Sequence, residues 1–193
     1  MTQVLFNTFG NSNLPVVSIG LGAILIFLLS VWLVARSLSK PQPLNIDLGK
    51  SPPLKHRGLI LLVSRAEPCL QAIQYHDPAL ERCWLICSKQ TEGIGKQLRA
   101  ELTNLKIGEP LIVNDIFDPI ECYRVVEKIY KTLPQSWKIE DVISDFTGMT
   151  AQASVGMVLA CSSLQANLQY TPAELNNGKP TGNSLTPIEI VIR

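Results

Sequence analysis

The residues best suited to chemistry lie in one run from Val142 to Ser163, VISDFTGMTAQASVGMVLACSS. It predicts an apolar strand that ends at Asp145, a turn from Thr147 to Thr150, and then a helix of small side chains. Gly148 permits a tight turn, and the threonine hydroxyls lie beside backbone N–H groups that have no partner where a helix starts. Because such N–H groups attract anions, the pattern predicts a turn that binds phosphate or another anion. The alternative is an ordinary strand–turn–helix unit whose threonines only cap the helix.

This turn is similar to a known motif. The residues DFTGMTAQASVG, from Asp145 to Gly156, resemble the D-x-T-G-G-T-K-x-M-S-x-G element of CARF domains, the CRISPR-associated Rossmann-fold sensors of cyclic oligoadenylates. The matching residues are Asp145, Thr147, Gly148, Thr150, Ser154 and Gly156, whereas Met149, Ala151 and Ala153 differ. The family pattern has a lysine where this chain has Ala151, so a role for a cation there does not carry over. The wider pattern of strands and helices extends the similarity to about residues 57–193.

Several short apolar runs precede this turn and predict the sheet that positions it. Each is bounded by polar residues, as is typical of strands buried on both faces. The runs are Gly58–Ser64, Cys83–Cys87 and Pro110–Val113. They alternate with amphipathic helices, which predicts an α/β fold: a Rossmann-like, mainly parallel sheet flanked by helices. Two further strands, Asn167–Tyr170 and Ile188–Ile192, are expected on either side of a loop rich in Gly, Pro and Asn.

In such a sheet, ligands bind beyond the carboxyl ends of the strands, where the strand order reverses. We expect that point between the first and fourth strands, so three polar loops should lie along one edge. Arg65 and Lys89 are the first candidates for phosphate contacts, with solvated surface charges as the alternative. No catalytic or metal-binding residue is predicted. The candidate ligand-binding residues are Ser64, Arg65, Glu67, Ser88, Lys89, Thr91, Asp145, Thr147, Gly148, Met149, Thr150 and Gln152.

The helix from Thr150 to Ser163 has almost no polar face, so it must be covered on more than one side. Either it is enclosed within the domain, or it packs against a second copy of the chain. The resemblance favours the second alternative, because CARF domains form homodimers with this helix near the interface. It also implies that the ring-shaped ligand lies across the two-fold axis. A two-fold site suits a ring with an even number of nucleotides, and the resemblance favours four, cyclic tetra-adenylate.

The first third of the chain predicts a membrane anchor. Leu14 to Ala35 is a run of 22 residues without a charge, long enough to cross a bilayer. Residues 36–57 contain five basic residues and one acidic residue, which places the following domain in the cytoplasm. A cleavable signal peptide fits less well, because residues 1–35 contain no charged side chain. The expected organisation is a short extracytoplasmic tail (1–13), a single span of the plasma membrane (14–35), a proline-rich basic linker (36–56) and the CARF-like domain (57–193).

Other chemistries have no signal in the sequence. The five cysteines form no CxxC pair, and the two histidines lack metal-ligand spacing, so no cofactor is predicted. From residue 58 onward there are twelve basic and fifteen acidic residues, which argues against a long nucleic acid as partner.

The resemblance therefore implies a membrane-bound effector of type III CRISPR systems that binds cyclic oligoadenylate in a CARF dimer. No second catalytic domain is visible, so the hypothesised output is perturbation of the membrane by an oligomeric pore or ion channel, with the membrane helix associating further in the bilayer. Two alternatives remain. The domain could be an anchored ring nuclease that degrades the messenger, or an anchored sensor that recruits a partner.

Overall fold

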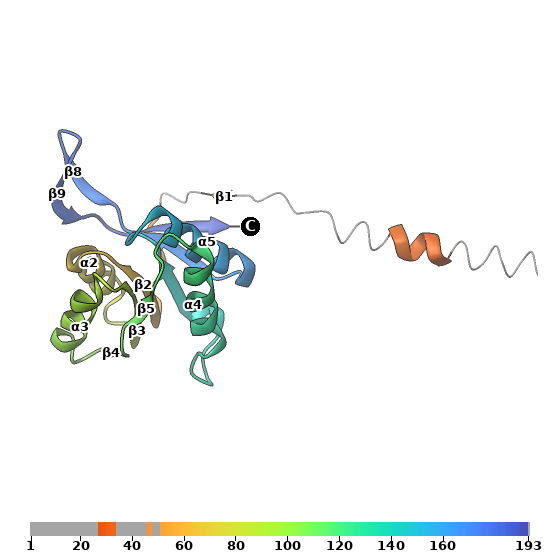
Figure 1. Ribbon diagram of the computed structural model, residues 1–193, viewed down its shortest axis with the longest axis horizontal. Coiled ribbons are helices and arrows are strands. Elements are labelled where there is room, and N and C mark those ends of the chain that lie inside the picture. The colour runs from red at the N-terminus through yellow and green to blue at the C-terminus, as the bar shows by residue number, and fades with distance from the viewer. Residues whose placement is uncertain (1–26, 34–45, 48–50, 193) are drawn as a thin grey trace, which may run out of the picture. The chain divides into compact units, whose positions relative to one another are not determined.

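The computed structural model describes residues 27–33, 46–47 and 51–192, and the chain divides into two compact units, residues 1–43 and 44–193 (Figure 1). In the first unit, residues 27–33 are helical and their side chains are exposed. Among the described residues, no helix combines the length and apolar character needed to cross a membrane. Most of the predicted span, residues 14–26 and 34–35, lies outside the described residues, as do the tail and much of the linker. The membrane anchor therefore stays a prediction.

The second unit is built on one eight-stranded sheet with a separate hairpin. The sheet order is β1-β10-β7-β6-β2-β3-β4, and β5 also pairs with β3. The strands are β1 (Ile46–Asp47), β2 (Gly58–Val63), β3 (Arg82–Ser88), β4 (Lys106–Ile107), β5 (Leu111–Val113), β6 (Val142–Asp145), β7 (Asn167–Tyr170), β8 (Ala173–Asn176), β9 (Lys179–Ser184) and β10 (Ile188–Ile192). Strands β7, β6, β2, β3, β4 and β5 are parallel, and β10 and β1 extend the sheet in antiparallel pairs.

Four helices cover the two faces of this sheet. They are α2 (Ala66–His76), α3 (Glu92–Glu101), α4 (Pro119–Lys131) and α5 (Ala151–Leu164), and a short 3-10 helix, η1 (Ile139–Asp141), precedes β6. Figure 1 shows α2 and α3 on one side of the central strands and α4 and α5 on the other. All six residues of β2 are buried, because apolar side chains from both layers pack against this central strand. The mainly parallel Rossmann-like sheet predicted from the sequence is confirmed.

The segment between β7 and β10 differs from the expected loop. It forms the antiparallel hairpin β8–β9, which projects away from the sheet in Figure 1. Asn177 and Gly178 connect its strands with φ angles of 50° and 77°. Two successive positive φ angles match the right-handed twist of paired strands, and an Asn-Gly pair adopts them readily. This hairpin signal was present in the sequence.

The chain just before β2 is held against the domain. The Tyr75 hydroxyl donates a hydrogen bond to the carbonyl of Pro53, and the Lys55 ammonium lies 4.0 Å from the centre of the Tyr75 ring. The carbonyl of Ser51 accepts from the N–H of Glu189 at 3.3 Å. Together with the pairing of β1 and β10, these contacts make the end of the predicted linker part of the second unit.

Helix α5 packs closely on α4 but keeps an exposed apolar strip. A Cβ atom at Gly156 would lie 2.2 Å from the carbonyl oxygen of Pro119, so only glycine allows the two helices to approach this closely. On the outer face of α5, Val155 is 50% exposed and Leu159 is 48% exposed. Helix α4 covers one side of α5, as expected if α5 is enclosed within the domain. The outer side has apolar residues that a second copy of the chain could cover, which is the other alternative.

Candidate functional site

The strand order reverses where the sequence predicted. Strand β2 lies between β3 and β6 and is parallel to both. The loops that follow these three strands therefore emerge at the same edge of the sheet. They carry the predicted residues Ser64, Arg65 and Glu67 after β2, Ser88, Lys89 and Thr91 after β3, and the motif turn after β6. In α/β sheets this crevice is where ligands bind.

Gly148 seats the motif turn on the end of β2. A Cβ atom added there would lie 1.7 Å from the carbonyl oxygen of Leu62 and 3.2 Å from the backbone nitrogen of Ser64. No side chain fits at those distances, so the turn can touch the first loop only because residue 148 is glycine. This contact directly brings together the loops after the first and fourth predicted strands.

Asp145 fixes the motif turn through hydrogen bonds to its carboxylate. It is 2% exposed, and its carboxylate accepts hydrogen bonds from the Thr147 N–H (2.9 Å) and hydroxyl, the Gln169 side-chain amide (2.9 Å) and the Thr171 hydroxyl (2.5 Å). Burial raises the pKa of Asp145, and the hydrogen bonds from Thr147, Thr171 and Gln169 oppose that rise. The carboxylate is a structural acceptor for donors from the motif turn, from β7 and from the residue that follows β7.

The other motif residues also shape the turn. The hydroxyl of Thr150, the N-cap of α5, accepts from the N–H of Ala153 (3.3 Å) and donates to the carbonyl of Ile116 (2.5 Å). The Ser154 hydroxyl donates to the carbonyl of Phe146 (2.9 Å). Because these hydroxyls are occupied, an anion would meet the amides of the first turn of α5, at Ala151 and Gln152, which have no acceptor within the helix.

Met149 adopts a conformation that favours glycine. Its φ angle is 65°, in the left-handed region, where a Cβ atom approaches the following carbonyl oxygen. The CARF motif has glycine at this position, and the left-handed conformation gives the physical reason for that choice. The turn therefore stores backbone strain beside the predicted ligand.

Replacing Met149 with glycine is expected to stabilise the domain by about 0.5–1 kcal/mol, since relief of the left-handed strain exceeds the extra entropy of the unfolded chain. The urea midpoint of unfolding measures the change. Met149→Ala keeps the Cβ atom and should give no such gain. Equal stabilisation by both variants would place the cause in the methionine side chain rather than in the backbone.

The β3–α3 loop is closed by its own hydroxyls. Thr91 Oγ1 accepts from the N–H of Ser88 (3.0 Å), and Ser88 Oγ accepts from the N–H of Thr91 (3.2 Å). Lys89 is exposed at the tip of this loop, and Arg65 is exposed at the start of α2. The carboxylate of Glu67 already has a partner, because it accepts a hydrogen bond from the Ser184 hydroxyl at the base of the hairpin (2.7 Å).

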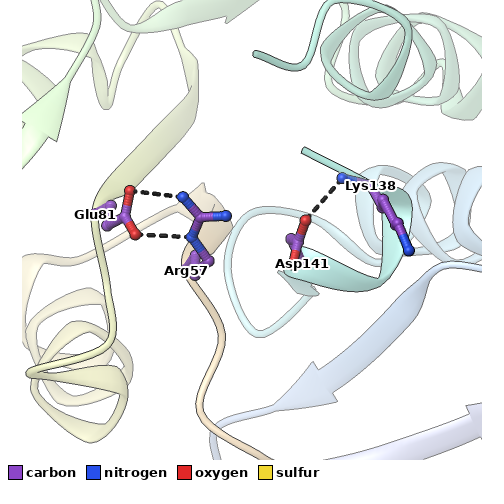
Figure 2. A network of polar contacts seen from close by, with 4 residues as sticks. All are labelled: Arg57, Glu81, Lys138 and Asp141. Carbon is purple, nitrogen blue, oxygen red and sulfur yellow. Dashed lines mark hydrogen bonds and ion pairs between the residues drawn. The ribbon is translucent and has the colours of Figure 1, made fainter. Parts of the chain in front are cut away.

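Cations at the two edges of the sheet differ in their partners. Near the start of β2, Arg57 makes two hydrogen bonds to Glu81, at 2.7 and 3.1 Å (Figure 2). The same figure shows the backbone N–H of Lys138 bonded to Asp141 at 2.7 Å. Arg65 and Lys89, at the ligand edge, form no ion pair with any residue that the structure describes. Lys89 nevertheless lies close enough to Glu121 for its charge to help lower the pKa of that carboxyl, after the hydrogen bonds that Glu121 accepts from Asn114 and Asp115.

Two segments at this edge were not predicted as part of the site. The β5–α4 loop reaches the turn through Ile116, whose carbonyl accepts from Thr150. Glu121 orders that loop by accepting the N–H groups of Asn114 and Asp115, each at 2.8 Å. The second segment is the base of the hairpin, where the N–H of Thr171 donates to the Thr147 hydroxyl (2.6 Å). Asn114 and Asp115 at the end of β5 were the sequence signal for the β5–α4 loop. No local pattern indicated that the base of the hairpin would reach the site.

No group of side chains suited to metal binding occurs within residues 27–33, 46–47 and 51–192. The five cysteines are buried, and burial raises the pKa of Cys69 and Cys122 to about 12. They therefore stay protonated and fill the core as small apolar side chains. The site that remains is a main-chain turn with two exposed cations.

The two histidines lie in the core rather than at the surface. His76 is fully buried, accepts at Nδ1 from the N–H of His56 (3.1 Å) and lies 2.9 Å from Gln169 Oε1 through Nε2. The proton is thus assigned to Nε2, and the ring is neutral. Burial lowers the pKa of His76 from 6.5 to about 4 and also lowers the pKa of His56.

This environment predicts acid sensitivity. A histidine whose pKa is lower in the folded state contributes stability above about pH 6.5, and that contribution is lost as the pH falls toward 4. The loss from His76 is about 2 kcal/mol at pH 5. Urea unfolding of the wild type and of His76→Gln at pH 7.5 and 5 measures it. The variant should lose less stability than the wild type over this range, and equal losses would contradict the assignment.

Comparison with known proteins places the fold. No protein-family model and no curated protein matches the chain. A type III CRISPR defence DNA nuclease activated by cyclic oligoadenylate is 15% identical over 69% of this chain and 20% of its own, with a TM-score of 0.51. Can2 from Sulfobacillus thermosulfidooxidans, in complex with cyclic tetra-adenylate, is 14% identical over 64% of this chain and 36% of its own, with a TM-score of 0.47.

Csm6 from Enterococcus italicus, bound to cyclic hexa-2'-fluoro-hexa-dAMP, is 12% identical over 66% of this chain and 36% of its own, with a TM-score of 0.44. The chain thus spans between 20% and 36% of the length of these three proteins. At these identities the likeness concerns the fold alone, and it rests on the match to the nuclease. The domain has a CARF-like Rossmann fold, as the motif predicted.

Proposed function

We propose that the second unit is a sensor domain that binds a cyclic oligoadenylate, as part of CRISPR antiviral defence. The observation that carries the proposal is the motif turn, seated on the end of β2 at the point where the strand order reverses. Amides at the start of α5 would face an anion bound there. Arg65 and Lys89 are exposed in the loops after β2 and β3, at the same edge of the sheet, and neither forms an ion pair with a described residue. These groups suit a phosphodiester, because amides and cations both stabilise its charge.

Cyclic tetra-adenylate is the ligand that we favour. A dimer with two-fold symmetry presents two identical turns to one ring, so a ring with an even number of nucleotides fits it. The exposed apolar strip at Val155 and Leu159 supports a dimer through α5, since packing against a second copy removes this strip from water.

The output that we propose acts at the plasma membrane. The supporting observations are in the sequence: 22 uncharged residues from Leu14 to Ala35, followed by a basic segment that favours a cytoplasmic domain. Ligand binding would alter the packing of the dimer, and oligomers of the membrane segment would then perturb or permeabilise the bilayer. Replacing Leu14–Ala35 with an unrelated anchor should abolish ligand-dependent ion flux in proteoliposomes. Flux that survives the replacement would contradict this output.

The binding experiment uses the full chain in detergent with cyclic tri-, tetra- and hexa-adenylate. Binding of the tetra-adenylate is expected, and Arg65→Ala and Lys89→Ala should each weaken it about tenfold, because each removes a charge-assisted hydrogen bond. Lys138→Ala, at the opposite edge of the sheet, is the matched control and should leave the affinity unchanged. If none of the three rings binds, the sensor function is wrong; release of linear product would instead indicate a ring nuclease.

A further inference from the structure

A continuous series of buried polar contacts runs from the motif turn to the segment that precedes β2. Asp145 accepts from Thr147 at one carboxylate oxygen and from the Gln169 side-chain amide at the other. The amide oxygen of Gln169 lies 2.9 Å from Nε2 of His76, and Nδ1 of His76 accepts from the N–H of His56. We call these five residues the buried relay.

The far end of the buried relay is fixed to the incoming chain. Nδ1 of His56 lies 2.7 Å from the carbonyl oxygen of Leu54, and Nε2 lies 3.1 Å from the side-chain amide of Asn167. His56 is therefore held by its own segment on one side and by β7 on the other. Because residues 51–56 connect the domain to everything that precedes it, movement of His56 reaches that segment directly.

Burial makes each contact in the buried relay dependent on the next. Gln169 and His76 are 0% exposed, Asp145 is 2% exposed and His56 is 8% exposed. Water cannot replace a lost partner at such positions, so a change at one contact shifts the neighbouring groups. Each histidine ring nitrogen has one partner, and the Gln169 amide donates to Asp145 through its nitrogen and contacts His76 through its oxygen.

A phosphate at the turn acts on the first contact. The Thr147 hydroxyl has a single proton, which it donates to Asp145, while its oxygen accepts from the N–H of Thr171. A phosphate oxygen near Thr147 competes for that proton, because a hydroxyl donates only one hydrogen bond. Asp145, which is 2% exposed, then loses one of its donors, and its carboxylate moves toward the remaining ones.

We propose that the buried relay couples occupation of the motif turn to the position of residues 51–56, with Gln169 and His76 as positioning residues. This inference rests on the proposed binding of a phosphodiester at the turn. It also assigns a role to the histidines, which are not among the candidate ligand-binding residues. The coupling is carried by physical contacts between named groups, so each can be removed and tested.

The chain has only two histidines, and both belong to the buried relay. In the full chain with ¹⁵N-labelled histidine rings, cyclic tetra-adenylate is expected to shift the ring nitrogen resonances of both. Gln169→Met should retain ligand affinity within about tenfold, since Asp145 keeps its other donors, but should abolish the shift at His56. Ser144→Ala is the matched control: Ser144 is also fully buried on β6, but its hydroxyl contacts the Tyr130 hydroxyl at 3.0 Å on the other face. It should preserve both binding and shifts.

The inference fails if wild type binds the ligand without shifts at the histidines, or if Gln169→Met binds with an unchanged shift at His56. If Gln169→Met does not fold, Gln169→Glu takes its place, because it removes the donor to Asp145 while keeping an acceptor for His76. If the wild type binds no ring, the proposed function fails but the coupling is still tested. Thr147→Val must then shift the His76 ring nitrogens in the absence of ligand, and unchanged resonances would overturn the inference independently.

Discussion

Gly148→Ala is expected to lower the free energy of unfolding by about 3 kcal/mol or more and to abolish ligand binding. The added Cβ atom would lie 1.7 Å from the carbonyl oxygen of Leu62, which belongs to the central strand of the sheet. Neither partner is a flexible side chain, so the turn must move away from β2 as a whole. That movement displaces the amides at the start of α5, which are the proposed phosphate contacts.

The matched control is Gly93→Ala in α3, where an added Cβ atom meets nothing within 4 Å. This variant should be as stable as the wild type or up to about 1 kcal/mol more stable, because alanine favours helix more than glycine does. Urea unfolding gives the stability, and titration with cyclic tetra-adenylate gives the affinity. If Gly148→Ala matches Gly93→Ala in both, the close approach of turn and strand does not control the site.

The sheet and its switch point could be predicted from the sequence because their signals are local. Strand β2 is a run of apolar residues buried on both faces, and β6 is the apolar strand that was predicted to end at Asp145. Strands β7 and β10 have the predicted bounds. In a doubly wound sheet the strand order reverses between the first and fourth strands, so the fold class predicts that β6 lies beside β2, whereas the full strand order could not be predicted. The short strand β4 and the pairing of β1 with β10 have no such pattern, since two residues carry no periodicity.

The roles of the site residues could not be predicted, because their partners are distant in the sequence. Asp145 contacts Gln169 and Thr171, more than twenty positions away, and Thr150 contacts Ile116 in a different loop. A motif match therefore located the turn correctly but assigned its hydroxyls to the ligand. In the structure those hydroxyls shape the turn, so the proposed phosphate contacts are the main-chain amides at the start of α5. Whether Asp145, Thr147 and Thr150 also touch a ligand stays a prediction.

Asp145→Ala is the second change with a large expected effect. It removes the acceptor of four hydrogen bonds and leaves the donors of Thr147, Gln169 and Thr171 buried without partners. Each buried donor without a partner costs about 1–3 kcal/mol, so the expected loss of stability is about 3–5 kcal/mol. The variant should also lose ligand affinity, because the same contacts fix the geometry of the turn.

Asp145→Asn separates the charge from the hydrogen bonds. It keeps one oxygen for Thr147 and removes a buried charge, whose burial raises the pKa of Asp145, but it places an NH₂ group against the Gln169 donor. The net loss should be smaller than for alanine, about 1–2 kcal/mol. Asp118→Ala is the control carboxylate: it caps α4 with one exposed hydrogen bond, to the N–H of Ile120, and its removal should cost about 1 kcal/mol.

Urea unfolding at pH 7.5 measures the stability of the three variants. We expect the largest loss of stability for Asp145→Ala, a smaller loss for Asp145→Asn and the smallest for Asp118→Ala. If Asp145→Asn proves as destabilising as Asp145→Ala, the negative charge itself stabilises the turn, and the four donors are of secondary importance. If Asp145→Ala costs no more than Asp118→Ala, water or a rearranged side chain satisfies the donors. The turn would then tolerate the loss of its central acceptor, and the buried relay would lose its first contact without consequence for the fold.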